Sequence, residues 1–312
     1  MCLYPKFIKN PKYRPNKKNN FNPPICTDRR VLYVPIGCGK CLECRKQKAR
    51  EWQVRLNEEL KVQKNAYFVT LTFSCEELNL LTKETNLKEC NAVAGIAVRR
   101  FLERWRKKHK KTIIHWLITE LGHNGTERIH LHGILFTELN LTNEYLENIW
   151  KYGMTYTGNY CNARTINYVI KYVLKIDTDH KNYEPQIFCS AGLGKNYINE
   201  ITKQIHKFDN ENTIDYYRLN NGAKIALPIY YRNHLFTEHQ RELLWTYLLD
   251  KNERFVLGNK IEHIDTDNGE RLYYSVLKKA QEDNIALGFG DDSKEWKKKE
   301  YNITLRMLNK RK

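Results

Sequence analysis

Two kinds of apolar segment are missing from this sequence of 312 residues. The first residues, MCLYPKFIKN, contain no apolar stretch of the kind found in a secretory leader, and no run of about 18 apolar residues occurs. The sequence therefore predicts a cytosolic protein with no membrane partner. In a reducing compartment, its nine cysteines are expected to be thiols or metal ligands rather than disulfides.

Acidic residues are also scarce relative to basic ones. There are 36 Asp and Glu against 53 Lys and Arg, which gives a formal net charge of +17. A field of that sign concentrates polyanions near the protein, and the charge is larger than solubility alone requires. Nucleic acid is therefore the expected partner, with an anionic membrane surface as the alternative.

Proline is rare except near the start of the chain. Most of the eight prolines fall within residues 1–36, between lysines and asparagines, and such a segment is expected to be irregular and to bury little apolar surface. We predict a Pro/Cys-rich N-terminal segment at 1–45, a catalytic domain at 46–200 and a basic helical extension at 201–312. The basic tail from Lys294 is expected to be partly disordered.

The central region mixes strand and helix patterns. The β-branched and aromatic residues of 66–74, 112–120 and 127–136 predict strands, and the last two are separated by a glycine-containing turn. Apolar residues recur at helical spacing over 92–109 and 162–175. The region is therefore predicted to be α+β, with an antiparallel central sheet packed by helices on one side.

The stretch ERIHLHGILF carries two histidines, His130 and His132, one residue apart in a predicted strand. Side chains alternate between the faces of a strand, so both imidazoles point the same way and can share one divalent ion. Glu120 ends the partner strand and is expected to be the third ligand, with Glu127 as the alternative. This donor set suits Mn²⁺ better than Mg²⁺, and Zn²⁺ also fits it.

Other histidine-based hydrolases fit this stretch poorly. A histidine-triad nucleotide hydrolase would need a third histidine where Ile134 stands, and a zinc deaminase would need a glutamate where His132 stands. A metal with open coordination positions can instead polarise a phosphodiester.

The stretch YVIKYVLK places Tyr168 and Tyr172 one helical turn apart, with Lys171 and Lys175 beside them. Apolar neighbours already provide this helix with a core face, so the tyrosines are not needed for packing. A phenolate can attack a phosphodiester and form a phosphotyrosyl intermediate. Nearby lysine or metal charge lowers the cost of forming that phenolate. We therefore predict catalytic roles for both tyrosines and both lysines.

Cys38, Cys41 and Cys44 form a C-x2-C-x2-C pattern. Three thiolates at this spacing can bind one ion, and tetrahedral zinc needs a fourth ligand, for which Cys2 is expected and Cys26 is the alternative. An iron–sulfur cluster also remains open. Such an ion would join the proline-rich start to the following basic helix. The basic residues of that helix are predicted to contact DNA phosphates: Arg45, Lys46, Lys48 and Arg50.

These motifs, taken together and in order, resemble the HUH endonucleases, in particular the replication initiators of gokushovirus-like microviruses. FVTLTFS resembles the family's first strand motif, HLH its histidine motif, YVIKYVLK its two-tyrosine motif and CGKCLECR its cysteine-rich segment. SAGLGKNYI and LPIYYRNHL resemble later segments, so the resemblance covers about residues 1–240. The chain departs from the family at Ile129, where a proline often stands.

The resemblance implies a ferredoxin-like antiparallel sheet and a divalent ion, Mn²⁺ or Mg²⁺, on the two histidines. It also implies a tyrosine that nicks single-stranded DNA at the viral origin and stays joined to the 5′-phosphate. The free 3′-hydroxyl would then prime rolling-circle synthesis by host polymerase and helicase in the bacterial cytoplasm. Two alternatives remain open: a zinc-stabilised, non-catalytic binder of single-stranded nucleic acid, and a plasmid-type initiator, relaxase or transposase of the same superfamily.

Overall fold

The computed structural model describes residues 2–63, 65–123, 127–158, 161–177, 179–180, 183–219, 222–290 and 296–309. The chain divides into two compact units. One unit comprises Met1–Lys48 with Ile198–Lys312, and the other, here called the sheet unit, is Ala49–Tyr197. The predicted three-part division by function stays a prediction.

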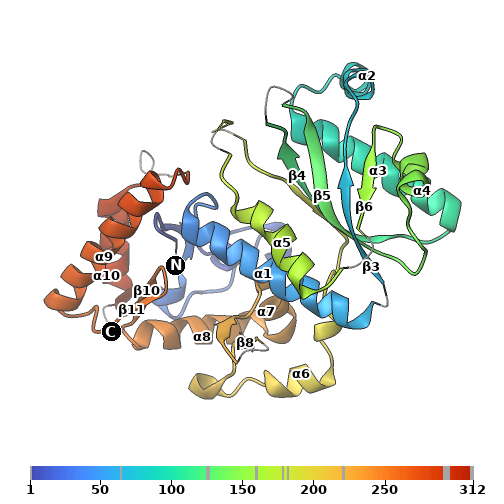
Figure 1. The fold of residues 1–312 in the computed structure, drawn as a ribbon. Helices are drawn as coiled ribbons and strands as arrows, with labels where there is room; N and C mark the ends of the chain where they lie inside the picture. Colours follow the sequence, from blue (N-terminus) through green and yellow to red (C-terminus); the bar gives the residue numbers. More distant parts are fainter. Residues whose placement is uncertain are drawn as a thin grey trace. The chain divides into compact units, whose positions relative to one another are not determined.

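The sheet unit is built on five antiparallel strands in the order β6–β3–β5–β4–β7. Figure 1 shows the strands side by side, with helices packed around them. The predicted α+β class with an antiparallel central sheet is confirmed. The elements in chain order are α1 (Leu42–Val62), β3 (Ala66–Leu71), α2 (Cys75–Thr85), α3 (Cys90–His109), β4 (Ile114–Leu121), β5 (Ile129–Phe136), α4 (Asn143–Trp150), β6 (Thr155–Thr157), α5 (Ala163–Leu174) and β7 (Ile187–Cys189).

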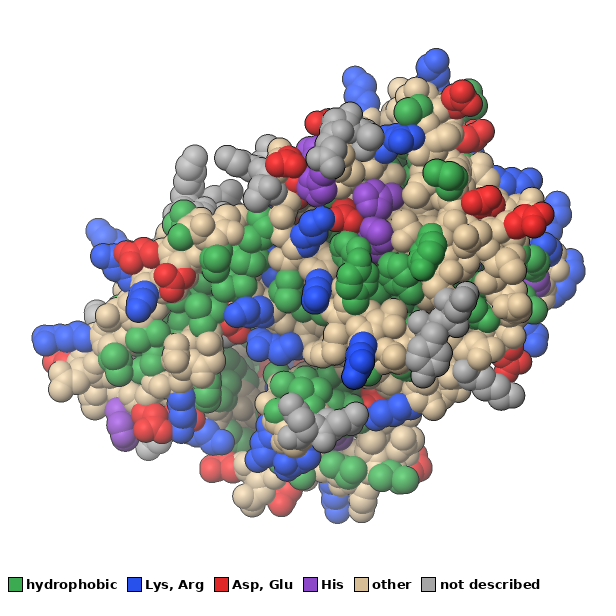
Figure 2. Space-filling model, in the orientation of Figure 1, with side chains coloured by type: hydrophobic (Ala, Val, Ile, Leu, Met, Phe, Trp, Pro, Cys, Tyr) green, Lys and Arg blue, Asp and Glu red, His purple; other side chains and the backbone are tan. Residues whose placement is uncertain are grey.

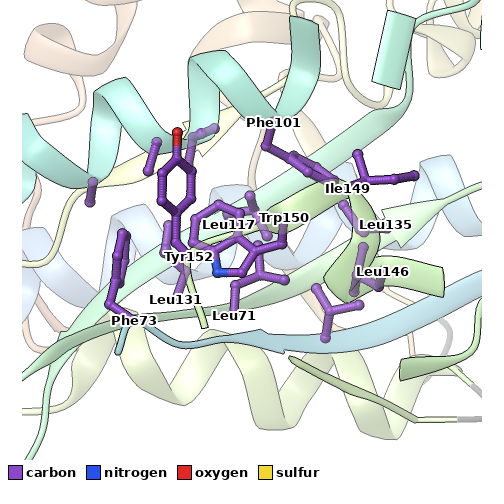
Figure 3. Packing of buried hydrophobic residues seen from close by; sticks show 14 of the residues in the cluster. Leu71, Phe73, Phe101, Leu117, Leu131, Leu135, Leu146, Ile149, Trp150 and Tyr152 are labelled. Carbon is purple, nitrogen blue, oxygen red and sulfur yellow. The ribbon is translucent and has the colours of Figure 1, made fainter. Parts of the chain in front are cut away.

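One face of this sheet packs against α3 and α4. Leu131 and Leu135 of β5 point into this layer, where they are fully buried with Phe101 of α3 and Trp150 of α4. Figure 3 shows the rings of Phe101 and Trp150 beside these leucines. Each such buried side chain contributes roughly 1.5–3 kcal/mol, and the Trp150 indole N–H also donates to the Thr72 carbonyl at 2.7 Å.

The opposite face is covered as well, by α1 and α5. Ile134 and Phe136 of β5 lie in this second core with Leu56 of α1 and Ile170 of α5. The prediction that helices pack on one side only is therefore wrong. The reason is that α1 and α5 each carry an apolar stripe that needs a partner, and the alternating strands offer apolar residues on both faces.

The other unit contains an additional core between the chain's start and its C-terminal helices. Leu3 and Tyr4 are buried there with Tyr273 and Leu277, so the prediction that the proline-rich segment buries little apolar surface is wrong at this point. The basic tail, expected to be partly disordered, forms a helix. The elements are β1 (Lys6–Lys9), β2 (Tyr33–Ile36), α6 (Glu200–Ile205), β8 (Tyr216–Arg218), β9 (Lys224–Ala226), α7 (Ile229–Leu235), α8 (Glu238–Asp250), β10 (Arg254–Val256), β11 (Asn259–Ile261), α9 (Asp267–Ala286) and α10 (Lys298–Asn309).

Among the described residues, no helix is both long enough and apolar enough to cross a bilayer.

Gly133 in the middle of β5 allows β4 to approach closely. A Cβ atom at this position would lie 2.1 Å from the Trp116 carbonyl oxygen and 2.8 Å from the Leu117 Cα. Both atoms belong to the backbone of β4, so they can move only if the strand moves.

We expect Gly133→Ala to lower the free energy of unfolding by at least the roughly 1–3 kcal/mol typical of overpacking, measured by urea denaturation. The matched control is Gly158→Ala, where the nearest atom to a new Cβ is the Phe68 Cβ at an ordinary 3.6 Å. That change is expected to stay within about 1 kcal/mol. Equal effects of the two substitutions would contradict the close approach of β4 and β5.

Candidate functional site

The pairing of β4 with β5 brings the predicted metal ligands together. In the antiparallel register, Glu120 stands opposite His130 and Ile118 opposite His132. The Nε2 atoms of His130 and His132 lie 3.1 Å and 2.9 Å from the same oxygen of Glu120, Oε2. The three side chains form a group whose ligand atoms can hold one metal ion.

The second nitrogen of each imidazole has its own partner. The Nδ1 atom of His130 faces the Arg128 carbonyl oxygen at 3.3 Å, and that of His132 lies 3.0 Å from the Thr70 hydroxyl oxygen. Such contacts orient a histidine ring and leave the opposite nitrogen available as a ligand. The donor set of two imidazoles and a carboxylate therefore fits a divalent ion.

Glu120 is only 12% exposed, and its carboxylate holds three cationic or hydrogen-bonding neighbours. Burial raises its pKa, but hydrogen bonds from His130, His132 and Lys175 outweigh that effect and hold the pKa well below its usual value. The Lys175 ammonium contacts the second carboxylate oxygen, Oε1. The alternative ligand, Glu127, is 73% exposed on its side chain and faces His180 instead.

Helix α5 carries both tyrosines and begins at a capping box. The Asn162 side chain accepts hydrogen bonds from the Arg164 and Thr165 amides, and the Thr165 hydroxyl accepts one from the Asn162 amide. These contacts satisfy amides that a helix start otherwise leaves unpaired. The apolar face of the helix is buried against the sheet, which fixes its rotation: Ile166, Val169, Ile170 and Val173.

This rotation places Tyr168 and Tyr172 beside the histidines. The Tyr172 ring stacks on the His132 ring with centroids 4.4 Å apart, and the two tyrosine hydroxyls lie 3.0 Å from each other. Tyr168 is 49% exposed. Burial, followed by the hydrogen bond from Tyr168, raises the pKa of Tyr172 above its usual value.

The two predicted lysines have different positions. Lys175 contacts Glu120, and its ammonium also lies 3.4 Å from His123 Nε2. Lys171 is exposed, and no hydrogen bond or ion pair of its side chain is found among the described residues. The structure therefore brings Lys175, but not Lys171, into the group around Glu120.

Phe68 and Thr70 of β3 belong to the same surroundings and were missed by sequence reasoning. Thr70 stands opposite His132 in the β3–β5 register. The Phe68 ring lies against three others, those of His132, Tyr156 and Tyr168, with centroid distances of 6.1, 6.4 and 5.8 Å. The alternation of 66–71 places both side chains on one face, but only the register shows which histidine they meet.

Figure 2 shows histidine side chains gathered on the face in view, with acidic, basic and hydrophobic side chains next to them. Tyr156 is 56% exposed, so the aromatic group is open to solvent on one side. A phosphodiester chain with unpaired bases can approach such a surface.

The cysteines of the N-terminal region converge as well. Cys2, Cys38, Cys41 and Cys44 form a group whose sulfur atoms can hold one metal ion. Cys26 lies outside it, with its thiol 3.0 Å from the Asp28 carbonyl oxygen. Hydrogen bonds from the neighbouring thiols, Cys2 first, lower the pKa of Cys41 to about 7. Four converging thiols are a ligand set that tetrahedral zinc prefers.

The basic residues predicted to contact DNA follow this group on α1. Lys46, Lys48 and Arg50 are exposed, whereas Arg45 is half-buried with its guanidinium 6.0 Å from the centre of the Phe289 ring. Their role in DNA binding stays a prediction.

Comparison with known proteins supports the resemblance that the motifs predicted. Residues 66–177 match the family model for replication-associated proteins of the ORF2 type. This range begins with β3 and ends just after α5. It therefore contains both histidines, Glu120 and both tyrosines.

Two curated relatives extend the similarity. The chain is 25% identical over 228 residues to the replication-associated protein VP4 of Bdellovibrio phage phiMH2K, covering 63% of this chain and 66% of the relative. It is 26% identical over 253 residues to the replication-associated protein ORF2 of Spiroplasma virus 4, covering 72% of this chain and 75% of the relative. No solved structure matches the chain. The predicted resemblance to phage replication initiators is thus confirmed.

Proposed function

We propose that this chain is a replication initiation endonuclease that nicks single-stranded DNA at a viral origin by tyrosine transesterification. The similarity to phage and virus replication-associated proteins supports a role in replication initiation. The observation that carries the nicking mechanism is the contact between the two groups of side chains. Tyr172 stacks on His132, and its hydroxyl is 3.0 Å from that of Tyr168, so two nucleophiles lie beside one set of metal ligands.

The reaction exchanges one phosphodiester for another. The oxygen of Tyr168 or Tyr172 attacks the scissile phosphorus and forms a bond to the 5′-phosphate. The bond between phosphorus and the 3′-oxygen breaks, and the 3′-oxygen takes a proton equivalent to the one that the phenol lost. Because the phosphotyrosyl bond remains an ester with a good leaving group, a 3′-hydroxyl can later reverse the step and rejoin the strand.

The two tyrosines are placed to act in succession. Their hydroxyls are within hydrogen-bond distance, so while one is joined to DNA or ionised the other can donate to it or remain free to attack. Nicking and later rejoining of a unit-length strand need two such nucleophiles. The exposed side chain of Tyr168 and the partly buried one of Tyr172 differ in access to solvent.

His130, His132 and Glu120 would hold the divalent ion, Mn²⁺ or Mg²⁺. When bound, such an ion supplies Lewis-acid polarisation of the phosphate oxygens. Thr70 and the Arg128 carbonyl keep the imidazoles oriented. Lys175 keeps the Glu120 carboxylate in place through its other oxygen.

The aromatic group supports single-stranded DNA as the substrate. Phe68, Tyr156 and Tyr168 present rings on a partly exposed surface next to the reacting hydroxyls. Unpaired bases stack on such rings, which contributes about 1–3 kcal/mol per base without requiring a specific sequence. Positive residues elsewhere, including Lys46, Lys48 and Arg50, would contact the DNA backbone.

The remaining partners follow from the product. A nicked strand with a free 3′-hydroxyl needs a polymerase to extend it and a helicase to displace the old strand. We assign both activities to the bacterial host, in its cytoplasm.

We expect Tyr168→Phe and Tyr172→Phe each to impair the full nicking and rejoining cycle, and the double variant to give no covalent adduct. The measurement is a denaturing gel after incubation with Mn²⁺ and labelled single-stranded oligonucleotides that tile the genome encoding the chain. Tyr156→Phe is the matched control, because it removes a neighbouring hydroxyl and keeps its ring. An adduct that survives in the double variant would overturn the assignment.

Glu120→Gln is expected to weaken Mn²⁺ binding at this site by about tenfold or more, since it removes the only charged ligand and 1.4 kcal/mol already corresponds to tenfold. Calorimetric titration or the electron paramagnetic resonance signal of free Mn²⁺ measures the affinity. Glu144→Gln on α4, an exposed acid in the first turn of its helix, serves as the control. An unchanged affinity in Glu120→Gln would exclude Glu120 as a ligand.

We also propose that Cys2, Cys38, Cys41 and Cys44 bind a structural zinc ion. Cys2 and Cys41 already lie in the core around Tyr273 and Leu277. An ion held there would fix the chain's first residues against the start of α1. Bound structural metal contributes its binding free energy to folding.

Cys41→Ser is expected to lose the zinc found by elemental analysis of the purified protein and to lower the melting temperature. Cys26→Ser should keep both, because Cys26 lies outside the group. Retention of a full equivalent of zinc in Cys41→Ser, with an unchanged melting temperature, would count against the four-cysteine site.

A further inference from the structure

A second group of metal-ligating side chains lies next to Glu120 and is not used in the proposed reaction. It comprises His123, just after β4, and Asp177 and His180, just after α5. A ligand atom of each lies within 4.8 Å of the others. All three residues belong to the sheet unit.

We propose that His123, Asp177 and His180 form a second divalent-cation site, distinct from the site on Glu120, His130 and His132. The donors are two imidazole nitrogens and a carboxylate, which favour Mn²⁺, Co²⁺, Ni²⁺ or Zn²⁺ over Ca²⁺. The ligand atoms converge from two segments that are far apart in the sequence. A metal site of this kind takes its ligands from whichever elements the fold brings together.

The contacts within the group show how its side chains are held. His180 Nδ1 lies 2.9 Å from Asp177 Oδ2, and His123 Nδ1 lies 3.0 Å from Asp179 Oδ2. The other Asp177 oxygen, Oδ1, accepts hydrogen bonds from the Asp179 and His180 amides. These amide contacts fix the Asp177 carboxylate and leave Oδ2 directed toward the imidazole.

A hydrogen-bonded turn explains the Asp177–His180 pair, but it does not explain why His123 joins them. His123 comes from the connection between β4 and β5, and its ring lies 6.2 Å from that of His180. Its Nε2 atom is 3.4 Å from the Lys175 ammonium. An ion would therefore replace or displace the lysine at that nitrogen, and Lys175 would keep its contact with Glu120.

The local charge gives an independent reason for a cation. Asp177, Asp179 and Glu127 gather here in a chain whose net charge is +17. The reaction proposed above brings a negatively charged phosphodiester to the neighbouring residue Glu120. Carboxylates at this position oppose its approach, whereas a divalent ion bound among them reverses the sign of the local charge.

The position of the site indicates what it would do. It would join the connection that follows Glu120 to the segment that follows the tyrosine helix α5. This link would fix the distance between the tyrosine hydroxyls and the ligands on β5. That positioning role rests on the proposed function, but the binding of the ion does not.

The test counts cations on the full-length chain whose four-cysteine group is first filled with zinc. Co²⁺ is added, and bound Co²⁺ is measured by equilibrium dialysis and by its visible absorption. We expect Asp177→Asn with His180→Gln to bind one equivalent less than the wild type. His130→Gln with His132→Gln should lose a different equivalent, and the four changes together should lose both.

His239→Gln with Asp215→Asn is the matched control, since it removes the same two side-chain types elsewhere and should bind as the wild type does. His123→Gln alone provides a second variant if the double change disturbs folding, which circular dichroism detects. Unchanged Co²⁺ binding in folded variants of His123, Asp177 and His180 would overturn the inference.

The outcome is separable from that of the nicking experiment. If the second equivalent is lost as expected while no DNA adduct ever forms, the cation site stands and the proposed function fails. If the adduct forms but the variants bind Co²⁺ as the wild type does, the nicking function stands and the second site fails.

Discussion

The antiparallel register of β4 and β5 is the constraint on which the candidate site depends. It sets Glu120 opposite His130 and directs both imidazoles to one face. A slip of one residue would turn the histidines into the core and expose Ile129 and Leu131, which are 1% and 0% exposed. Losing the burial of each would cost roughly 1.5–3 kcal/mol. The core on one face therefore fixes the ligands on the other.

The position of the tyrosines follows from a second hydrophobic constraint. The buried face of α5, including Val169 and Val173, allows one rotation of the helix on the sheet. At that rotation Tyr172 meets His132 and Tyr168 meets Phe68. The site therefore has two independent parts, each positioned by its own core, and they meet through stacked rings rather than through a shared backbone segment.

Periodicity was enough to predict the parts that lie within one element. The alternation around His130 and the four-residue spacing of Tyr168 and Tyr172 both hold in the structure. Thr70 was out of reach because its contact with His132 depends on the pairing of β3 with β5, which no local pattern specifies. The convergence of His123 with Asp177 has the same origin, since it depends on where the chain goes after α5. The errors in the fold prediction also concern long-range partners: composition over residues 1–36 hides the burial of Leu3 by α9, and an amphipathic pattern does not say which face of a sheet a helix covers.

Charge links the candidate site to the substrate that we propose. The Lys175 ammonium provides positive charge at Glu120, on the side away from the histidines. A divalent ion at Glu120, His130 and His132 would take over that role, and the lysine would then be repelled by the ion and available to a phosphate group. Lys175 follows α5 directly, so its movement would remain beside the two tyrosines. Ion binding and phosphate binding at this site would therefore favour each other through one side chain, although most of the chain's positive charge lies elsewhere.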